Sequence, residues 1–340
     1  MFRKGLAVAV ILLFIGMTIS SSASFNLEKQ STIATFEGTT FYVDDDFNES
    51  TPGWNVTHFA TINRARDNAV DGDTIFVYSG TYGRFHVRKS IQIIGENKHT
   101  TIINGNWSYF NTISIETENF LIKGFTVIKG GYGISVQNQR DVIISDMILT
   151  NNDLGIIHRN NRNVHIDNIT FDHNNGKAFE FWNAQNCSIT HCIFDNDGIY
   201  HGGFSPSGSN SLYFRYNLFT NNSPLSLGYQ CTDNGKTVIE SNVFQNNDYA
   251  IITNTCTDVI TQKNNFIDNG QHIRLRKITP FIMIPLYINF KNNWDNNYWD
   301  DWSQIDSYKI KGFWHHHVLP FIKFPIREFD YNPAQEPFDI

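Results

Sequence analysis

The chain has 340 residues and a formal net charge of −7, and only 17% of its residues are charged. This length can bury one large core or build an elongated repeat. Lysine and arginine form no basic footprint of the kind that nucleic acid requires, so we expect no nucleic-acid partner.

The first 24 residues have the pattern of a secretory signal peptide. Arg3 and Lys4 precede an apolar run, residues 6–19, which small residues follow. This run is shorter than the roughly 20 residues of a membrane-spanning helix. We therefore expect residues 1–24 to be removed, residues 25–40 to form a linker, and the protein to be secreted, at the cell surface or periplasmic. An uncleaved membrane anchor is the alternative.

Export would permit glycosylation in a host with the machinery. The sequons begin at Asn48, Asn55, Asn106, Asn168, Asn186 and Asn221.

A motif of about eleven residues recurs through the middle of the chain. It reads VIISDMILTNN from Val142, LYFRYNLFTNN from Leu212 and TVIESNVFQNN from Thr237, and successive copies begin 22 to 25 residues apart. Such spacing marks a repeat architecture. Each copy consists of short runs of period two, interrupted by Asn, Asp and Gly, which indicates short strands. Three strands per repeat predict an all-β fold, a right-handed parallel β-helix of about 8–10 coils over residues 41–295.

Stacked coils, about 4.8 Å apart, should place equivalent residues in columns. Two columns are apolar: Leu149, Phe171, Phe194, Phe219, Phe244 and Phe266; then Ile144, Ile166, Ile189, Phe214 and Ile239. A third changes from apolar to Asn: Met147, Ile169, Cys192, Asn217, Asn242 and Asn264. A fourth is polar: Asn152, Asn174, Asp197, Asn222, Asn247 and Asn269. Because Asn ladders bond along a stack, we interpret these Asn residues as structural.

Two of the four cysteines occupy equivalent positions in adjacent coils. Cys231 and Cys256 are 25 residues apart, so their Cα atoms should lie within disulfide range. We predict a disulfide between them, with stacked free thiols as the alternative. Cys187 and Cys192 share one coil and occupy apolar columns, so we interpret them as small core residues.

One outward column contains a carboxylate pair. Asp172 and Asp195 should lie one coil apart, near 5 Å, where they would repel and could recruit Ca²⁺. That separation also suits a retaining glycosidase. Glu180, Trp182 and His201 follow on the adjoining strand, and an aromatic ring beside carboxylates suits a sugar. The alternative is that outward Asp residues at a turn are simply solvated.

The C-terminal part contains two further candidates. His315, His316 and His317 could bind copper or zinc, although consecutive residues of an extended segment point to alternating faces. Residues 278–290 are nearly all apolar and break the repeat. They could cover the last coil or contact a membrane or a protein partner. Residues 296–340 are predicted to form an irregular cap.

Several segments resemble a known family. Residues 59–105 contain the pattern GDTI.V..GTY, residues 296–302 read NNYWDDW, and residues 330–340 read DYNPAQEPFDI. With the repeats, these resemble the pectin-lyase-like right-handed β-helix proteins, and most closely the exported NosD-type proteins. The resemblance covers residue 41 to the end. It implies a short helix, Thr61–Ala69, that caps the first coil.

The resemblance is specific for fold and not for activity, since this fold hosts many functions. The Arg-containing lyase motif, the esterase Gln-Asp pair and the polygalacturonase motifs of the superfamily are all missing. We therefore expect an exported, non-catalytic module that binds a polysaccharide or other glycan and requires no cofactor. Two alternatives stay open: a polysaccharide lyase or glycoside hydrolase that uses the carboxylate groove, and a NosD-like accessory protein that handles copper or a cofactor.

Overall fold

The computed structural model describes residues 36–175, 177–197, 199–201, 210–222, 227–230, 237–254, 259–279, 292–316 and 323–340. The chain divides into two compact units, Met1–Thr32 and Ile33–Ile340. The first unit, with the predicted signal peptide, lies outside the described residues, and all that follows concerns the second. None of the described helices is long and apolar enough to cross a membrane.

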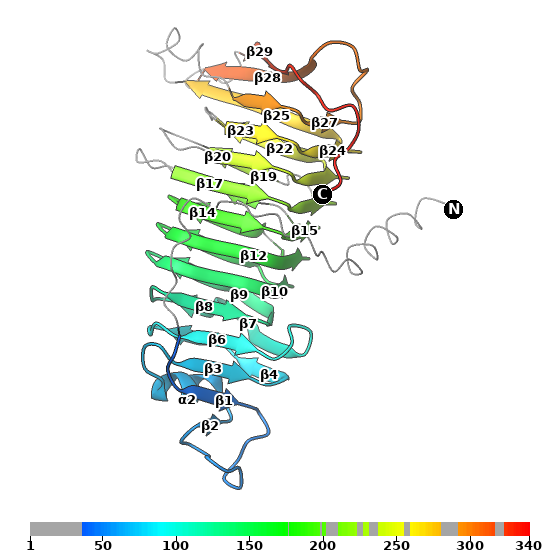
Figure 1. The fold of residues 1–340 in the computed structure, drawn as a ribbon. Coiled ribbons are helices and arrows are strands. Elements are labelled where there is room, and N and C mark those ends of the chain that lie inside the picture. Colours follow the sequence, from blue (N-terminus) through cyan, green and yellow to red (C-terminus); the bar gives the residue numbers. More distant parts are fainter. Residues whose placement is uncertain are drawn as a thin grey trace, which may run out of the picture. The chain divides into compact units, whose positions relative to one another are not determined.

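The second unit is a right-handed parallel β-helix of about eight turns, as the sequence predicts (Figure 1). Each coil contributes strands to three faces. The first face consists of β1 (Thr40–Val43), β3 (Thr74–Val77), β6 (Gln92–Gly95), β8 (Phe120–Lys123), β14 (Gln185–Thr190), β17 (Asn210–Arg215), β20 (Thr237–Glu240), β23 (Val259–Gln262), β26 (Asn293–Asp295) and the first parts of β10 (Arg140–Thr150) and β12 (Arg162–Asp172).

The second face contains β4 (Gly80–Gly83), β15 (Ile193–Asp195), β18 (Leu218–Thr220), β21 (Val243–Gln245), β24 (Asn265–Ile267), β27 (Tyr298–Trp299), the ends of β10 and β12, and the first parts of β7 (Thr101–Ile115) and β9 (Thr126–Gln137). The third face contains β5 (Phe85–Val87), β11 (Leu154–Arg159), β13 (Lys177–Trp182), β16 (Ile199–His201), β19 (Leu227–Gln230), β22 (Tyr249–Asn254), β25 (Gln271–Thr279), β28 (Tyr308–His316) and the ends of β7 and β9. We call the turn between the first and second faces the first corner, and the turn between the second and third faces the second corner.

Both corners contain residues in left-handed backbone conformations, which helps explain why the second corner is rich in Asn. One residue per coil has a positive φ at the first corner: Asp146, Asn168, His191, Tyr216, Ser241, Lys263 and Asn296. The second corner has the same feature at Asn151, His173, Asn196, Asn221, Asn246 and Asp268. Among residues with a side chain, Asn and Asp tolerate this region best.

Directly after the left-handed residue, an inward Asn joins neighbouring coils from Asn217 onward at the first corner and, except at Asp197, throughout Asn152 to Asn269 at the second corner, which confirms both predicted ladders. The Asn242 Oδ1 accepts from the backbone N–H and the Nδ2 of Asn217, at 3.0 and 2.9 Å. Asn242 in turn donates from both of its nitrogens to the Asn264 Oδ1, at 2.9 Å each. The ladder continues through Asn297 to the buried carboxylate of Asp330. These buried amides therefore hold the corners and are not ligand groups.

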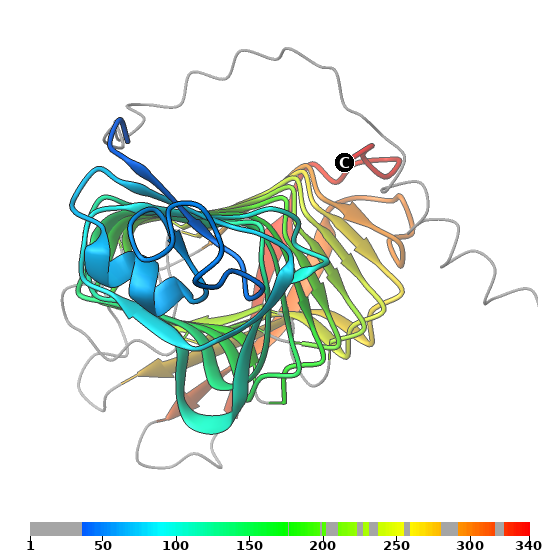
Figure 2. The ribbon, with the colours of Figure 1, turned by 90° about the horizontal axis from the view of Figure 1, so that it is seen from below.

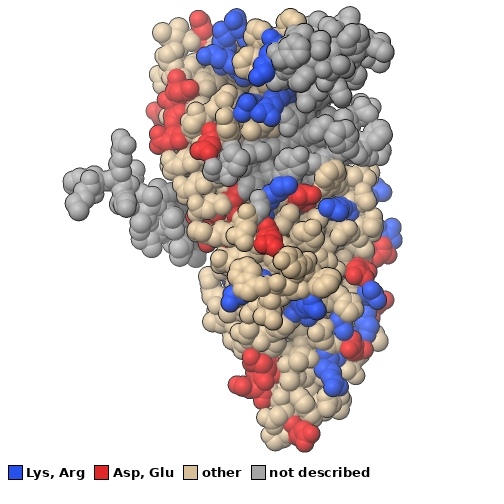
Figure 3. All heavy atoms as spheres, turned by 180° about the vertical axis from the view of Figure 1, so that it is seen from behind, with Lys and Arg blue, Asp and Glu red and all other residues tan. Residues whose placement is uncertain are grey.

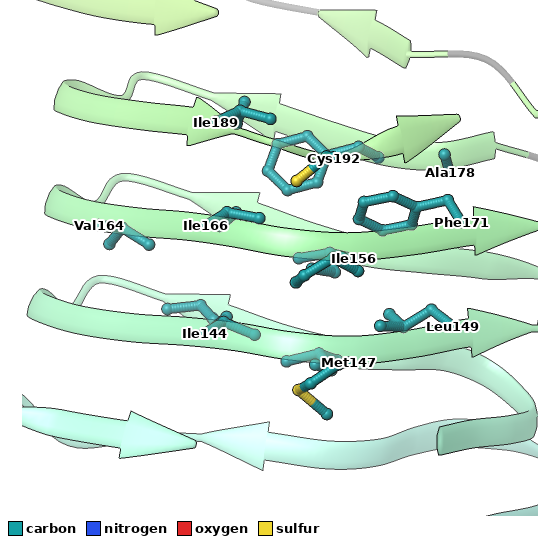
Figure 4. Close-up of a cluster of buried hydrophobic side chains, with 14 of the residues drawn as sticks. Ile144, Met147, Leu149, Ile156, Val164, Ile166, Phe171, Ala178, Ile189 and Cys192 are labelled. Atoms are coloured by element: carbon teal, nitrogen blue, oxygen red, sulfur yellow. The ribbon is translucent and has the colours of Figure 1, made fainter. Parts of the chain in front are cut away.

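The core is a column of stacked rings, also as predicted. Phe171, Phe194, Phe219, Phe244 and Phe266 stack with centroids 4.6 to 5.0 Å apart. Trp299 and Tyr308 extend the column at 4.4 and 4.1 Å. Leu149 pairs with Phe171 in register, and Ile144, Ile166 and Ile189 form the neighbouring column (Figure 4).

A helix covers the N-terminal end of the β-helix. Helix α2 (Ile62–Asn68) lies across the first coils, as Figure 2 shows in a view along the β-helix. The Thr61 side chain caps it by accepting from the Arg64 N–H, so the predicted helix is confirmed. The strand pair β2 (His58–Phe59) and β1 precedes the first full coil.

At the other end, parallel pairing continues past residue 295, because β27 pairs with β24 and β28 pairs with β25. Part of the segment predicted as a cap thus completes the last coil. Strand β29 (Lys323–Asp330) then runs antiparallel to β28 and ends the sheet.

Cys187 and Cys192 are free and buried, as expected of core residues. Burial raises the pKa of each thiol to about 12, so neither is a reactive nucleophile or a ready metal ligand. The predicted partners Cys231 and Cys256 lie outside the described residues.

Candidate functional site

The structure places Asp172 and Asp195 side by side at the second corner. They are register partners at the ends of β12 and β15. The Asp172 Oδ1 contacts the His173 Nδ1. The Asp195 Oδ1 accepts from the Nδ2 of Asn221 at 2.8 Å and from the Nδ2 of Asn196 at 3.2 Å. Both carboxylates are therefore held by turn residues of the same corner.

Glu180 and Trp182 do not share that groove, contrary to the sequence interpretation. Lys177 begins β13 at the second corner, and a strand rises about 3.3 Å per residue, so Glu180 lies roughly 10 Å further along the third face. Trp182 is the last residue of β13, at the far end of that face. The sequence analysis placed Glu180 and Trp182 beside the second corner because they follow it in the chain, without allowing for the length of β13. His201 ends β16, and its side chain lies outside the described atoms.

Glu180 instead forms a local hydrogen-bonded cluster. It accepts from the Trp182 Nε1 at 2.7 Å and the Lys177 Nζ at 3.2 Å, and the Arg159 guanidinium lies 3.7 Å away. Burial acts to raise the pKa of Glu180, but the bonds from Trp182 and Lys177 outweigh it and hold the pKa below its usual value. Glu180 is therefore ionised near neutral pH and cannot serve there as a general acid.

An aromatic loop that the sequence interpretation missed projects from the same corner. In β7 the chain takes seven residues from Asn104 to Asn111, while β9 takes four over the matching interval, so the ladder bulges. The bulge exposes Trp107 by 59%, Tyr109 by 92% and Phe110 by 70%. Bulges commonly re-aim side chains beside functional sites.

Specific contacts hold this aromatic loop, residues 105–111, away from the core. The Arg84 guanidinium lies 5.4 Å from the centre of the Phe110 ring and donates to the Ser108 Oγ at 2.9 Å. Trp107 has a φ of 53°, which is rare for a large residue. Residues held in such conformations cluster at functional sites. The sequence signal was the extra length of this coil and its three rings, GNWSYFN.

The aromatic loop and the carboxylate pair lie along one line. Asn104, which precedes the loop, aligns with Ile128, then Thr150 and then Asp172. Three steps of about 4.8 Å separate Asn104 from Asp172 by roughly 14 Å. A polymer that follows the second corner could contact both features.

The second corner is acidic beyond the aromatic loop. Figure 3 shows acidic side chains along one edge there. The residues at this corner are Asp153, Asp172, Asp195, Asp248, Asp268, Asp300 and Asp301. A row of like charges repels a polyanion and attracts cations.

His272, Asp300 and Asp301 form the one group with metal-site geometry among the described residues, and sequence reasoning missed it. The His272 Nε2 lies 2.9 Å from the Asp300 Oδ1 and 3.3 Å from the Asp301 Oδ1. The hydrogen bond from His272 holds the pKa of Asp301 below its usual value. The Tyr308 hydroxyl donates to the Asp301 Oδ2 at 3.4 Å, and burial raises the pKa of Tyr308.

The Asn ladder fixes where the His272 ring carries its proton. The Asn269 Oδ1 accepts from Asn247, so its Nδ2 must face the His272 Nδ1, at 3.2 Å. Nδ1 is therefore an acceptor, and the ring proton lies on Nε2, between the two carboxylates. A metal ligand needs the lone pair on that nitrogen and donates its other N–H to an acceptor. The group thus fits a hydrogen-bonded structural cluster better than a metal site.

The predicted copper ligands are not described at the level of side chains. His315 and His316 end β28, and His317 lies outside the described residues. Most of the apolar segment 278–290 also lies outside them. Copper, Ca²⁺ and a contact through 278–290 stay predictions.

The comparisons with known proteins agree on the fold. A family model described as "Right handed beta helix region" matches residues 90–229. No curated protein matches the chain. The pectate lyase Pel9A aligns with a TM-score of 0.50 and 15% identity, over 73% of this chain and 77% of that one.

Two further solved structures are similar. An alginate lyase from Paenibacillus sp. str. FPU-7 has a TM-score of 0.49 and 11% identity, over 64% of this chain and 90% of that one. A family 28 exopolygalacturonase from Yersinia enterocolitica has a TM-score of 0.49 and 14% identity, over 78% of this chain and 62% of that one. At these identities the likeness concerns the fold alone.

Proposed function

We propose that this chain is an exported right-handed β-helix protein that binds a polysaccharide along its second corner and does not cleave it. The observation that carries the proposal is the exposed aromatic loop, aligned on one corner with the Asp172–Asp195 pair.

The aromatic loop has the chemistry of a sugar platform. The C–H groups on one side of a sugar ring form an apolar surface that packs against an aromatic face, while its hydroxyls stay in water. Trp and Tyr suit such half-wet contacts, since each has an apolar body and a polar handle. Three adjacent exposed rings form an apolar patch of the kind that marks an interaction site.

The charge of the corner restricts the sugar. Beyond the aromatic loop, a polymer would pass the carboxylates of Asp153, Asp172 and Asp195. These would repel a polyuronate and accept hydrogen bonds from the hydroxyls of a neutral chain. The favoured ligand is therefore a neutral polysaccharide.

We find no candidate general acid for hydrolysis among the described residues of this corner. Such a group needs a raised pKa and access to the glycosidic oxygen. The carboxyl there with a raised pKa is Asp197, which is 4% exposed and bonded within the Asn ladder. The juxtaposition of Asp172 and Asp195 nevertheless keeps a glycoside hydrolase as the second candidate.

The test is a binding panel of neutral and uronic-acid polysaccharides, with reducing-sugar release measured in parallel. Protein from a host without N-glycosylation avoids modification at Asn106. The variant Trp107→Ala/Tyr109→Ala should lose at least roughly tenfold in affinity for the neutral ligand, because each ring contact contributes about 1 kcal/mol. The variant Tyr331→Ala, which removes a ring that is 77% exposed elsewhere, should bind normally.

Equal binding by the two variants would contradict the proposed platform. Release of reducing ends that Asp172→Asn abolishes would replace the binding module with an enzyme.

A further inference from the structure

The C-terminal end of the third face carries a row of cations across three adjacent strands. Leu275 in β25 pairs with Gly312 in β28, and the residues directly before them are Arg274 and Lys311. Lys311 in turn pairs with Arg327 in β29. Neighbouring residues on each strand face inward, since Ile310 and Leu275 are buried, so the three cations share the outer surface.

Two more cations flank this row. Lys309 lies two residues before Lys311, and Arg276 lies two residues after Arg274, on the same side of their strands. We call Arg274, Arg276, Lys309, Lys311 and Arg327 the basic face. Figure 3 shows Lys and Arg side chains gathered at this end of the molecule.

The basic face has no acidic partner among the described residues. None of its five residues belongs to an ion pair within the described segments. The adjacent Glu328 is buried and accepts from Trp294 and Asn292. Burial and the nearby Arg274 lower the pKa of Arg276. Like charges opposite one another destabilise a sheet, so an external anion would stabilise this arrangement.

Apolar groups border the basic face. Phe313 pairs with Arg276 and is 49% exposed, and Phe324 on β29 is 53% exposed. The adjoining sequence is rich in apolar residues and holds no Asp or Glu: residues 277–293 read KITPFIMIPLYINFKNN, and residues 313–323 read FWHHHVLPFIK. Cations beside exposed aromatic side chains are typical of surfaces that bind the interface of an anionic bilayer.

We infer that the basic face docks onto an anionic lipid surface, independently of the polysaccharide proposed for the second corner. Each cation near such a surface contributes about 1 kcal/mol, and the attraction is screened by salt. The occupant is a headgroup layer of phosphatidylglycerol type, because the cations form a row across three strands and the exposed rings of Phe313 and Phe324 border it.

The test is co-sedimentation of the full chain with vesicles of phosphatidylcholine alone and of phosphatidylcholine mixed with phosphatidylglycerol. Binding to pure phosphatidylcholine vesicles measures any insertion of the apolar N-terminal run. The readout is therefore the increase in vesicle binding that phosphatidylglycerol causes. The variant Arg274→Gln/Lys311→Gln/Arg327→Gln should reduce that increase roughly 100-fold. The wild-type increase should fall steeply with added salt.

A matched control removes the same charge elsewhere. Arg88 and Arg140 pair with Glu116 and Glu118, and Lys123 is exposed. The variant Arg88→Gln/Lys123→Gln/Arg140→Gln should keep nearly all of the lipid-dependent binding, and melting curves should confirm that both variants fold. No dependence on phosphatidylglycerol, or equal losses in both variants, would overturn the inference. Stronger binding to soluble polygalacturonate than to the vesicles would assign the basic face to a glycan instead.

Discussion

At the scale of single residues, Asp197 is the exception in an otherwise amide ladder. In neighbouring coils the Asn Nδ2 donates to a carbonyl of the preceding coil, as Asn174 does to Leu149 at 3.0 Å and Asn222 to Phe194 at 3.1 Å. The carbonyl in register at the Asp197 level is that of Phe171. An ionised carboxylate has no hydrogen to donate there, and a protonated one does.

This environment favours the neutral form of Asp197. Burial raises its pKa to about 7, the hydrogen bonds from Asn174 oppose the rise, and the nearby Asp172 adds to it. The unfolded value is near 3.8, so the native state binds more protons between these two pH values. The free energy of unfolding should therefore fall as pH rises from about 4 to about 7, by up to about 4 kcal/mol for a shift of this size.

Asp197→Asn should remove this pH dependence, because the amide restores the missing donor and cannot ionise. Denaturant unfolding should be measured at several pH values from 4 to 8. The free energy of unfolding of the variant, relative to the wild type, should rise from about pH 4 to about pH 7 and then stay constant. Asp195→Asn, at a half-buried outward position nearby, should keep the wild-type slope. A slope unchanged in Asp197→Asn would place the titrating group elsewhere.

Single residues also mark the limit of the sequence analysis of the site. The pairing of Asp172 with Asp195 followed from the repeat, since register alone sets it. The position of Trp182 did not follow from the repeat, because the length of β13 determines at which end of the third face Trp182 lies. The aromatic loop was not predicted, because it interrupts the repeat pattern that predicts the columns.

At the scale of elements, corners matter as much as strands. From Asn152 onward, coils meet through inward Asn side chains as well as through backbone hydrogen bonds. The columns were predictable because a shift by one residue would turn every core side chain outward. The continuation of the Asn ladder through Asn297 to Asp330 was not predictable, because these residues follow a break in the repeat.

Asn242 joins three coils, and its replacement should show how much the Asn ladder at one corner contributes to stability. Besides its bonds to Asn217 and Asn264, its Nδ2 donates to the Phe214 and Glu240 carbonyls at 2.9 and 3.1 Å. Asn242→Ala leaves several buried groups unpaired, each costing about 1–3 kcal/mol. Thermal unfolding should show a loss of at least that size. Gln245→Ala, which changes an outward residue of the same coil, should have little effect, and similar melting of both variants would contradict the ladder.

At the scale of the whole β-helix, the fold separates three surfaces along one scaffold. The second corner carries the aromatic loop in its N-terminal half and carboxylates beyond it. The third face ends in the basic face. A protein that held a polysaccharide along one corner and a lipid surface at one end could keep the polymer close to a membrane.

The central claim is that a polysaccharide lies along the second corner, and hydroxyl-radical footprinting tests it most directly. With the neutral ligand identified in the panel at saturation, oxidation of Trp107, Tyr109 and Phe110 should fall severalfold, because sugar rings would cover side chains that are now exposed. Oxidation of His173, beside Asp172, should fall as well, while Phe324 and Tyr331 should react as in the free protein. Unchanged oxidation of the three loop rings under saturating ligand, or protection confined to Phe324 and Tyr331, would contradict the account.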